Sequence, residues 1–307
     1  MAIRSDLALE AVEAFLQRQR VEEAPGIQVD REEKEGEILI QRVKVVDERG
    51  EELTGKKKGT YVTLTSQSFR ERRKDQQEKL ARVLSREIQG LLPRSGMSVL
   101  VVGLGNQEAT PDSLGPRVVK KLLVSRHLAP KMPKDYEGEL GTLSAIAPGV
   151  LGQTGIETKD VILGITKEIR PDAVLAVDAL AAGSIQRIGS TIQLADTGIR
   201  PGSGVGNARA EITKEALGVE AVVAIGIPTV VHALTIARES LLAFLQQKNQ
   251  FQDNLDAFLE EHLAPVMGHL MVTPKEIDSL MEDMGAVVAA GINAAVHPAV
   301  AREESLL

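Results

Sequence analysis

The stretch "VVGLGNQEATPDSLGP", residues 101–116, joins an apolar run to a glycine turn, a polar loop and the start of a helix. A short run that is apolar at every position predicts a strand buried on both faces. Pro116 lacks a backbone N–H and is tolerated only in the first turn of a helix, so we expect a helix to begin near Gly115 or Pro116. Asp112 is then left in the loop between the carboxyl end of the strand and the helix.

Beyond residue 98 the chain alternates short apolar strands with helices. The apolar runs predict strands at residues 98–105, 172–180 and 219–227, and the helical patterns predict helices at 116–126, 158–169, 228–247 and 273–296. The last helix has the signature of a capping box, with Thr273 bonding forward, Glu276 reaching back and Pro274 in the first helical position. This alternation predicts an α/β fold, a mostly parallel sheet with helices on both faces.

The first 95 residues have a different pattern of expected elements. A helical pattern around Leu7 and Phe15 precedes two period-two strands, residues 38–47 and 60–66, and a charged amphipathic helix, residues 70–92. The charged run at 31–37 is most simply a loop, and the glycine-bounded segment at 48–59 a turn. We therefore expect an N-terminal β-containing extension, residues 1–95, packed on an α/β core, residues 96–307, the two forming one continuous structural domain.

Composition excludes several classes of function. The 307 residues carry a formal net charge of −7, only 2% are aromatic and none is tryptophan. A direct nucleic-acid partner is not expected, because backbone binding needs positive charge and base stacking needs aromatic faces. The absence of cysteine excludes disulfides, thiolate nucleophiles and Cys-ligated zinc. With no secretory h-region and no run of about 18 apolar residues, we predict a soluble intracellular protein that has no membrane partner.

A second acid has a position like that of Asp112. Asp178 follows the apolar run "AVLAV" and should also lie at the carboxyl end of a buried strand. Ligands bind outside the carboxyl ends of the strands in open α/β sheets, and a charge there is costly unless it is solvated or paired. If the strands are neighbours, the two carboxylates face one cleft, share a proton and can activate water. The alternative is that each aspartate is an ordinary helix cap or turn former.

Other candidates carry weaker signals. The segment "GLGNQE" begins like a dinucleotide fingerprint but has Glu108 where the third glycine belongs. The segment "GKKKG" is typical of a basic hairpin turn. A glycine-rich loop could line a substrate groove, and its candidate residues are Gly202, Ser203, Gly204, Gly206 and Arg209. Arg200, Arg209 and Lys214 lie within this loop or follow it. Of the histidines, His232 falls inside a helical pattern, and none has the spacing of a zinc site.

Seven stretches together carry a family resemblance. They are "GKKKGTYVTL", "VVGLGN…TPDSLGP", "PGVLGQTGIET", "DALAAGSIQRI", "DTGIRPGSGVGN", "AIGIPTVV" and "LMVTPKEID". In them the chain resembles the germination proteases of spore-forming bacteria over nearly its whole length. The resemblance implies a cytoplasmic endopeptidase of the spore core that degrades small acid-soluble spore proteins during germination. It further implies a homotetramer and an atypical aspartic-type mechanism, whose two aspartates fall on Asp112 and Asp178.

The resemblance also implies a zymogen that removes its own N-terminal segment. Its substrates are cut after an acid that is followed by an apolar residue, then Ala, with another acid beyond. The segment "RSDLALEA" fits with Asp6, Leu7, Ala8 and Glu10, so we expect self-cleavage between Asp6 and Leu7. An acid before the cut bond needs a cationic partner, for which Arg200, Arg209 and Lys214 are candidates. The alternative is an ordinary helix N-terminus capped by Ser5 or Asp6.

A more distant likeness is to the hydrogenase maturation peptidases. They share glycines at the positions of Gly103, Gly105 and Gly115 and acids at those of Asp112 and Asp178. Those enzymes add a histidine and bind a metal through all three groups, whereas "GIRPGSGVG" has no histidine. Two carboxylates alone make a poor catalytic metal site, so we expect water attack between two aspartates with no metal and no cofactor. His232 as a metal ligand, a metal-dependent peptidase and a non-catalytic nucleotide-binding module stay open as alternatives.

Overall fold

The computed structural model describes residues 5–19, 21–34, 37–128, 138–200, 211–247, 255–303 and 305–307. These residues form one nine-stranded sheet in the order β1-β2-β3-β7-β8-β6-β4-β5, with β9 paired to β8. The strands are β1 Ile27–Lys34, β2 Ile38–Val45, β3 Gly59–Thr65, β4 Val99–Gly103, β5 Leu143–Ile146, β6 Ala173–Ala182, β7 Thr191–Ala195, β8 Ala221–His232 and β9 Met271–Val272. The pairs among β5, β4, β6 and β8 are parallel, so the predicted α/β fold with a parallel core is confirmed.

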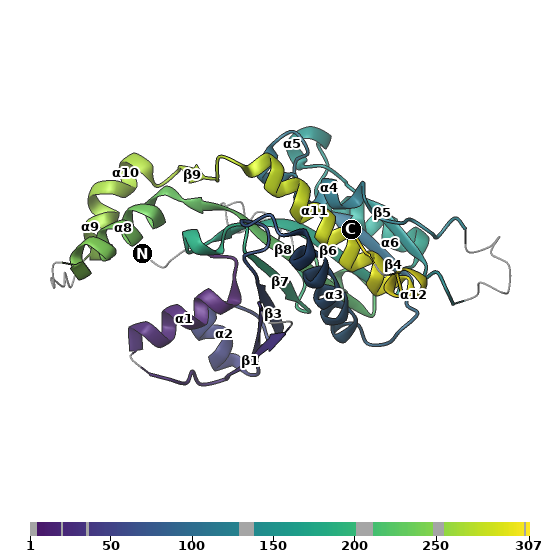
Figure 1. Cartoon of the computed structure of the whole chain (residues 1–307), viewed down its shortest axis with the longest axis horizontal. Coiled ribbons are helices and arrows are strands. Elements are labelled where there is room, and N and C mark those ends of the chain that lie inside the picture. The colour runs from purple at the N-terminus through teal and green to yellow at the C-terminus, as the bar shows by residue number, and fades with distance from the viewer. Residues whose placement is uncertain are drawn as a thin grey trace.

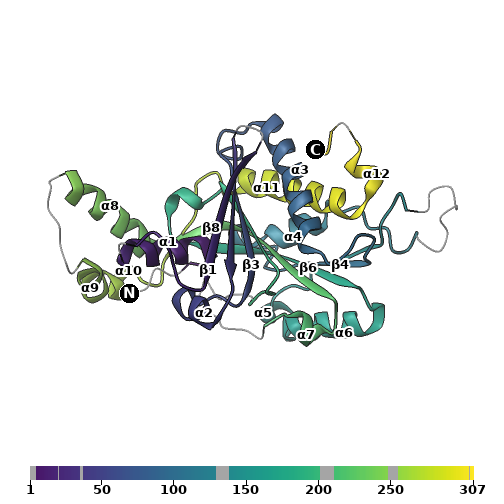
Figure 2. The ribbon, with the colours of Figure 1, turned by 90° about the horizontal axis from the view of Figure 1, so that it is seen from below.

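Helices cover both faces of this sheet. The helices of the described residues are α1 Ala8–Gln19, α2 Glu48–Thr54, α3 Lys74–Leu91, α4 Leu114–Val119, α5 Leu151–Thr154, α6 Thr158–Ile169, α7 Lys214–Leu217, α8 Ala233–Gln247, α9 Leu255–Phe258, α10 Ala264–Met267, α11 Ile277–Val296 and α12 Pro298–Ala301. Figure 2 shows α3 and α11 on one side of the strands and α6 and α7 on the other. Alternate residues of β4 serve the two cores: Val99 and Val101 face α3 and α11, whereas Leu100 and Val102 face α6 and α7.

The N-terminal strands continue the sheet of the core. Strand β3 pairs antiparallel with β7, and β7 pairs antiparallel with β8. Helix α1 packs its apolar face on the same sheet, where Leu9 and Val12 join Tyr61 and Ala224 in one buried cluster. The described start of the chain, through Ala8, Leu9 and Val12 of α1, is therefore held on the sheet next to its parallel strands.

Strand β8 is longer than its sequence pattern predicts. Residues 228–232, which we expected to open a helix, belong to β8, and α8 begins only at Ala233. Leu180 pairs with Pro228 and Ala181 with Val230, so Thr229 is an inserted residue in the pairing. A bulge tolerates proline within a strand, and the β-branched residues that follow favour extended backbone. Helix α8 then leads to α9 and α10 at one end of the molecule (Figure 1).

Two N-terminal predictions are wrong. The segment predicted as a turn at 48–59 contains helix α2, which Asp47 caps by accepting from the Gly50 N–H at 3.0 Å and which Gly55 ends with φ +65°. The charged run predicted as a loop provides Arg31–Lys34 of strand β1, which pairs with β2. Most of β1 is exposed, as an edge strand can be, and this exposure explains why the strand lacks an apolar pattern.

The capping box predicted for the last long helix does not form. Helix α11 begins at Ile277, and the Thr273 hydroxyl instead donates to the Thr229 carbonyl oxygen at 2.9 Å. By length and composition α11 could cross a membrane, but 61% of its most apolar window is buried. Met281, Met284 and Val287 are fully buried in the main core, so the apolar character of α11 is that of a core helix. The predicted helix at 116–126 is also shorter, because α4 ends at Val119.

Candidate active site

Asp112 lies in a tight turn between β4 and α4. It ends the 3₁₀ turn η1, Thr110–Asp112, and α4 begins at Leu114, one residue before the predicted start. The Asn106 N–H donates to Asp112 Oδ2 at 2.8 Å, and the Thr229 hydroxyl donates to the Pro111 carbonyl oxygen at 2.7 Å. The inserted residue of β8 therefore anchors the turn that carries Asp112.

Asp178 lies on β6 immediately past the end of β4. Gly103, the last residue of β4, pairs with Val177, so no β4 residue lies beside Asp178. The side chain is buried, with 7% of the residue exposed, and its Oδ1 accepts from the Ala179 N–H at 3.0 Å. We expected Asp178 at the carboxyl end of its strand, but β6 continues to Ala182. What Asp178 marks is the carboxyl end of the neighbouring strand.

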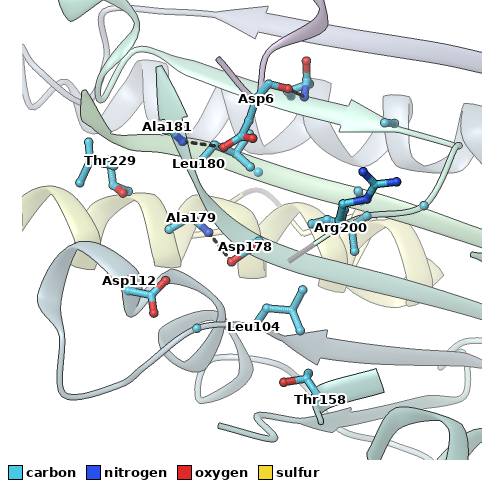
Figure 3. A pocket seen from close by; sticks show the side chains of 18 of the residues that line it. Asp6, Leu104, Asp112, Thr158, Asp178, Ala179, Leu180, Ala181, Arg200 and Thr229 are labelled. Carbon is cyan, nitrogen blue, oxygen red and sulfur yellow. Dashed lines mark hydrogen bonds between the residues drawn. The ribbon is translucent and has the colours of Figure 1, made fainter. Parts of the chain in front are cut away.

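The two aspartates line one cavity of about 610 Å³. Figure 3 shows Asp112 entering it from its turn and Asp178 from β6. Leu104, Thr158, Arg200 and Thr229 also line it. A cavity of this size can hold a peptide segment, so the structure brings the two acids to the same water-accessible space.

Three glycines make the turn possible. A Cβ on Gly103 would lie 2.3 Å from the Gly115 carbonyl oxygen, and a Cβ on Gly115 would lie 2.3 Å from the Leu104 carbonyl oxygen. Gly105 has φ +108°, and a Cβ there would lie 2.0 Å from the Asp112 carbonyl oxygen. The glycine pattern that resembles a nucleotide fingerprint therefore packs α4 against β4 and leaves room for the backbone of Asp112.

The N-terminal segment reaches the same cavity. Asp6 is among the lining residues, its N–H donates to the Ala181 carbonyl oxygen at 3.1 Å, and the Ala181 N–H donates to Asp6 Oδ2 at 2.9 Å. Leu7 and Ala8 are fully buried. Lys56 and Gln193, which no sequence motif marks, also line the cavity. Nothing in the charged run around Lys56 distinguishes it from the exposed lysines beside it.

Glu10 joins α1 to the segment that follows β6. Its Oε2 accepts from the Gly183 N–H at 2.7 Å and from the Ser5 hydroxyl. Burial raises the pKa of Glu10, while these hydrogen bonds and the charge of Arg187 lower it and Glu13 raises it further. A raised pKa means that the folded chain holds this proton more tightly than the unfolded chain.

We expect this carboxyl to stabilise the fold fully below its unfolded pKa and to lose that contribution as the pH rises through the folded pKa. The free energy of unfolding of the unaltered chain minus that of Glu10→Gln should therefore fall as the pH increases. Urea unfolding over a pH series measures it, with exposed Glu22→Gln as the control. A rise in stability of the unaltered chain relative to Glu10→Gln with increasing pH would contradict the expectation.

Of the other candidate site residues, only some lie in the part of the chain that the structure describes. Gly202, Ser203, Gly204, Gly206 and Arg209 lie outside the described residues. Arg200 lines the cavity, whereas Lys214 begins α7 and is not among the described lining residues.

His232 is the last residue of β8, not a helical residue as predicted, and it is not among the described residues that line the cavity. In the described part of the chain no three His, Asp or Glu side chains are grouped as metal ligands would be.

Comparison with known proteins gives this site a family. The family model for germination protease matches residues 5–255 and 243–306, nearly the whole chain. The chain belongs to the germination protease family. The germination protease of Caldanaerobacter subterraneus subsp. tengcongensis is 43% identical over 320 residues, covering 99% of this chain and 97% of its own. Those of Bacillus subtilis and Priestia megaterium are 41% and 40% identical, each covering 98% of this chain and 95% of its own.

Membership in the germination protease family confirms the resemblance seen in the sequence and identifies the chain as a protease of spore germination. Among solved structures, a [NiFe] hydrogenase maturation protease HycI from Thermococcus kodakarensis is similar with a TM-score of 0.35 and 16% identity. The similarity covers 67% of this chain and 98% of that one. A likeness of this degree supports no conclusion about the present site.

Proposed function

We propose that this germination protease hydrolyses peptide bonds with Asp112 and Asp178 acting as a pair on one water molecule. The observation that supports the proposal most strongly is their shared cavity. Two carboxyl groups from different elements can divide the work of general base and general acid. The backbone N–H groups of Asn106 and Ala179 each hold one of the four carboxylate oxygens, which fixes the directions of both groups.

The chemistry requires only these two groups, water and the substrate. One carboxylate takes a proton from water as the water oxygen bonds to the carbonyl carbon. The C–N bond then breaks, and the other carboxyl group donates a proton to the leaving amine nitrogen. The products are a new carboxyl end and a new amino end.

We infer that the substrates are small acid-soluble spore proteins and that the enzyme works in the spore core as a homotetramer. The family resemblance supports this part of the proposal. It also supports processing of the chain itself between Asp6 and Leu7, a bond whose first residue lines the cavity.

One incubation tests the proposal. The purified chain is mixed with a small acid-soluble spore protein at mildly acidic pH, and all new N-termini are sequenced. We expect cuts after acidic residues that precede apolar ones, and a new N-terminus of the enzyme at Leu7. An intact substrate would refute the proposed activity, and an enzyme N-terminus other than Leu7 would refute the proposed processing site. Chelator added to a parallel sample should leave the rate unchanged; loss of activity would favour a metal-dependent peptidase.

A further inference from the structure

A row of residues across three strands joins Asp178 to Gln193, which binds the N-terminal segment. Asp178 of β6, Gly226 of β8 and Gln193 of β7 are register partners on three adjacent strands. Register partners present their side chains on the same face of a sheet. Gly226 has no side chain, and the Leu180 side chain lies over it, 2.5 Å from where a Cβ of Gly226 would be. The acid at one end of this row and the amide at the other are therefore on the same side of the sheet.

Asp6 forms hydrogen bonds with three residues of the surrounding strands and loop. Ala181 uses both its N–H and its carbonyl oxygen on Asp6, at 2.9 Å to the side chain and 3.1 Å from the Asp6 N–H. The Asp6 carbonyl oxygen accepts from Lys56 Nζ at 2.8 Å and from Gln193 Nε2 at 3.3 Å. The Ala8 N–H donates to Gln193 Oε1 at 2.7 Å, which turns the amide NH₂ of Gln193 toward Asp6.

Lys56 is an unusual residue to place here. Burial lowers its pKa, and the charges of Asp6 and Glu10 oppose that effect. Withdrawing an ammonium group from water is costly unless it is paired. The Lys56 ammonium reaches two successive backbone carbonyls, those of Ser5 and Asp6. Both carbonyl acceptors of this ammonium group therefore lie in the segment that the proposed processing removes.

We propose that Lys56, Gln193 and the Ala181 N–H form the subsite for the acidic residue that precedes the cut bond, and that Asp6 fills this subsite in the uncleaved chain. The inference rests on the proposed function. The Ala181 N–H binds the acidic side chain, and Lys56 supplies the opposite charge. Lys56 and Gln193 also bind the carbonyl oxygen of the same residue, where negative charge grows when water adds. An acidic substrate residue takes the place of Asp6 once the segment has left.

A double-mutant cycle on self-cleavage of the full-length chain tests the subsite. We expect Lys56→Met to slow release of residues 1–6 by about 100-fold, as loss of one oxyanion donor does, and Asp6→Asn to slow it by at least about 10-fold. The double variant should be no slower than Lys56→Met alone, because both changes remove one interaction. Lys56→Arg keeps the charge and should recover part of the rate, and exposed Lys58→Met is the matched control.

Thermal unfolding monitored by circular dichroism establishes that each variant is folded. A wild-type rate for Lys56→Met, no recovery in a folded Lys56→Arg variant, or single effects that multiply in the double variant would each overturn the subsite. An unaltered chain that cuts neither itself nor a small acid-soluble spore protein would overturn the proposed function, and the subsite with it. The two failures are therefore distinguishable.

Discussion

Replacing Asp178 with asparagine should lower kcat for cleavage of a small acid-soluble spore protein by at least about 1,000-fold, with the protein still folded. General acid–base catalysis contributes about 10²–10⁴-fold, and an amide can neither take the proton from water nor return it to the amine. Asparagine has the shape of aspartate, and its Oδ1 can still accept from the Ala179 N–H that Asp178 binds at 3.0 Å. Asp112→Asn should have a loss of similar size.

The matched control is Asp160→Asn, which changes an exposed acid in the first turn of α6 and should leave kcat unchanged. The double variant, with both aspartates replaced by asparagine, should have about the same kcat as either single variant, because removing one member of the pair already disables it. A folded Asp112→Asn or Asp178→Asn protein that retains a tenth of the wild-type rate would refute the pair.

Gly105→Ala should lower kcat by about 100-fold or more, although residue 105 supplies no reacting group. Gly105 has φ +108°, and the added Cβ would lie 2.0 Å from the Asp112 carbonyl oxygen and 3.1 Å from Asp112 Oδ1. The turn must move, and displacing a catalytic group by about 1 Å can cost about 100-fold. The strain should also reduce the free energy of unfolding by about 1–3 kcal/mol.

Gly96→Ala is a control that introduces backbone strain without moving Asp112. Gly96 has φ +71°, but a Cβ there meets nothing within 4 Å. This variant should lose stability by a comparable mechanism and keep its kcat. Equal activity losses in the two variants, measured under conditions where both are folded, would mean that Gly105 does not act through the position of Asp112.

The fold was predictable where local physics and burial agree. The all-apolar runs at β4 and β6 can be satisfied only by strands covered on both faces, and Pro116 set the start of α4 to within two residues. Strand β1 and the end of β8 were not predictable, since β1 is an edge strand rich in charged residues and the end of β8 follows a proline. In both segments, pairing with neighbouring strands outweighs the local pattern.

The candidate site was predictable only in part. Asp178 interrupts an apolar run, and Asp112 lies in the loop that joins another apolar run to a helix, so the sequence alone singles out both as candidates. Lys56 and Gln193 give no such signal, because a lysine in a basic run is usually solvated and a glutamine in a strand often faces water. Their placement depends on β3 and β7 lying side by side and on α1 crossing the sheet, and no short-range pattern contains those facts.

The most direct test of the aspartate pair is a crystal structure of the protein with a peptide whose cut bond is replaced by a hydroxyethylene group, which mimics the addition of water. The proposed mechanism requires that hydroxyl to lie within about 3.2 Å of a carboxyl oxygen of Asp112 and of one from Asp178. A peptide bound in the cavity with its hydroxyl in contact with neither carboxyl group, or with only one of them, would contradict it.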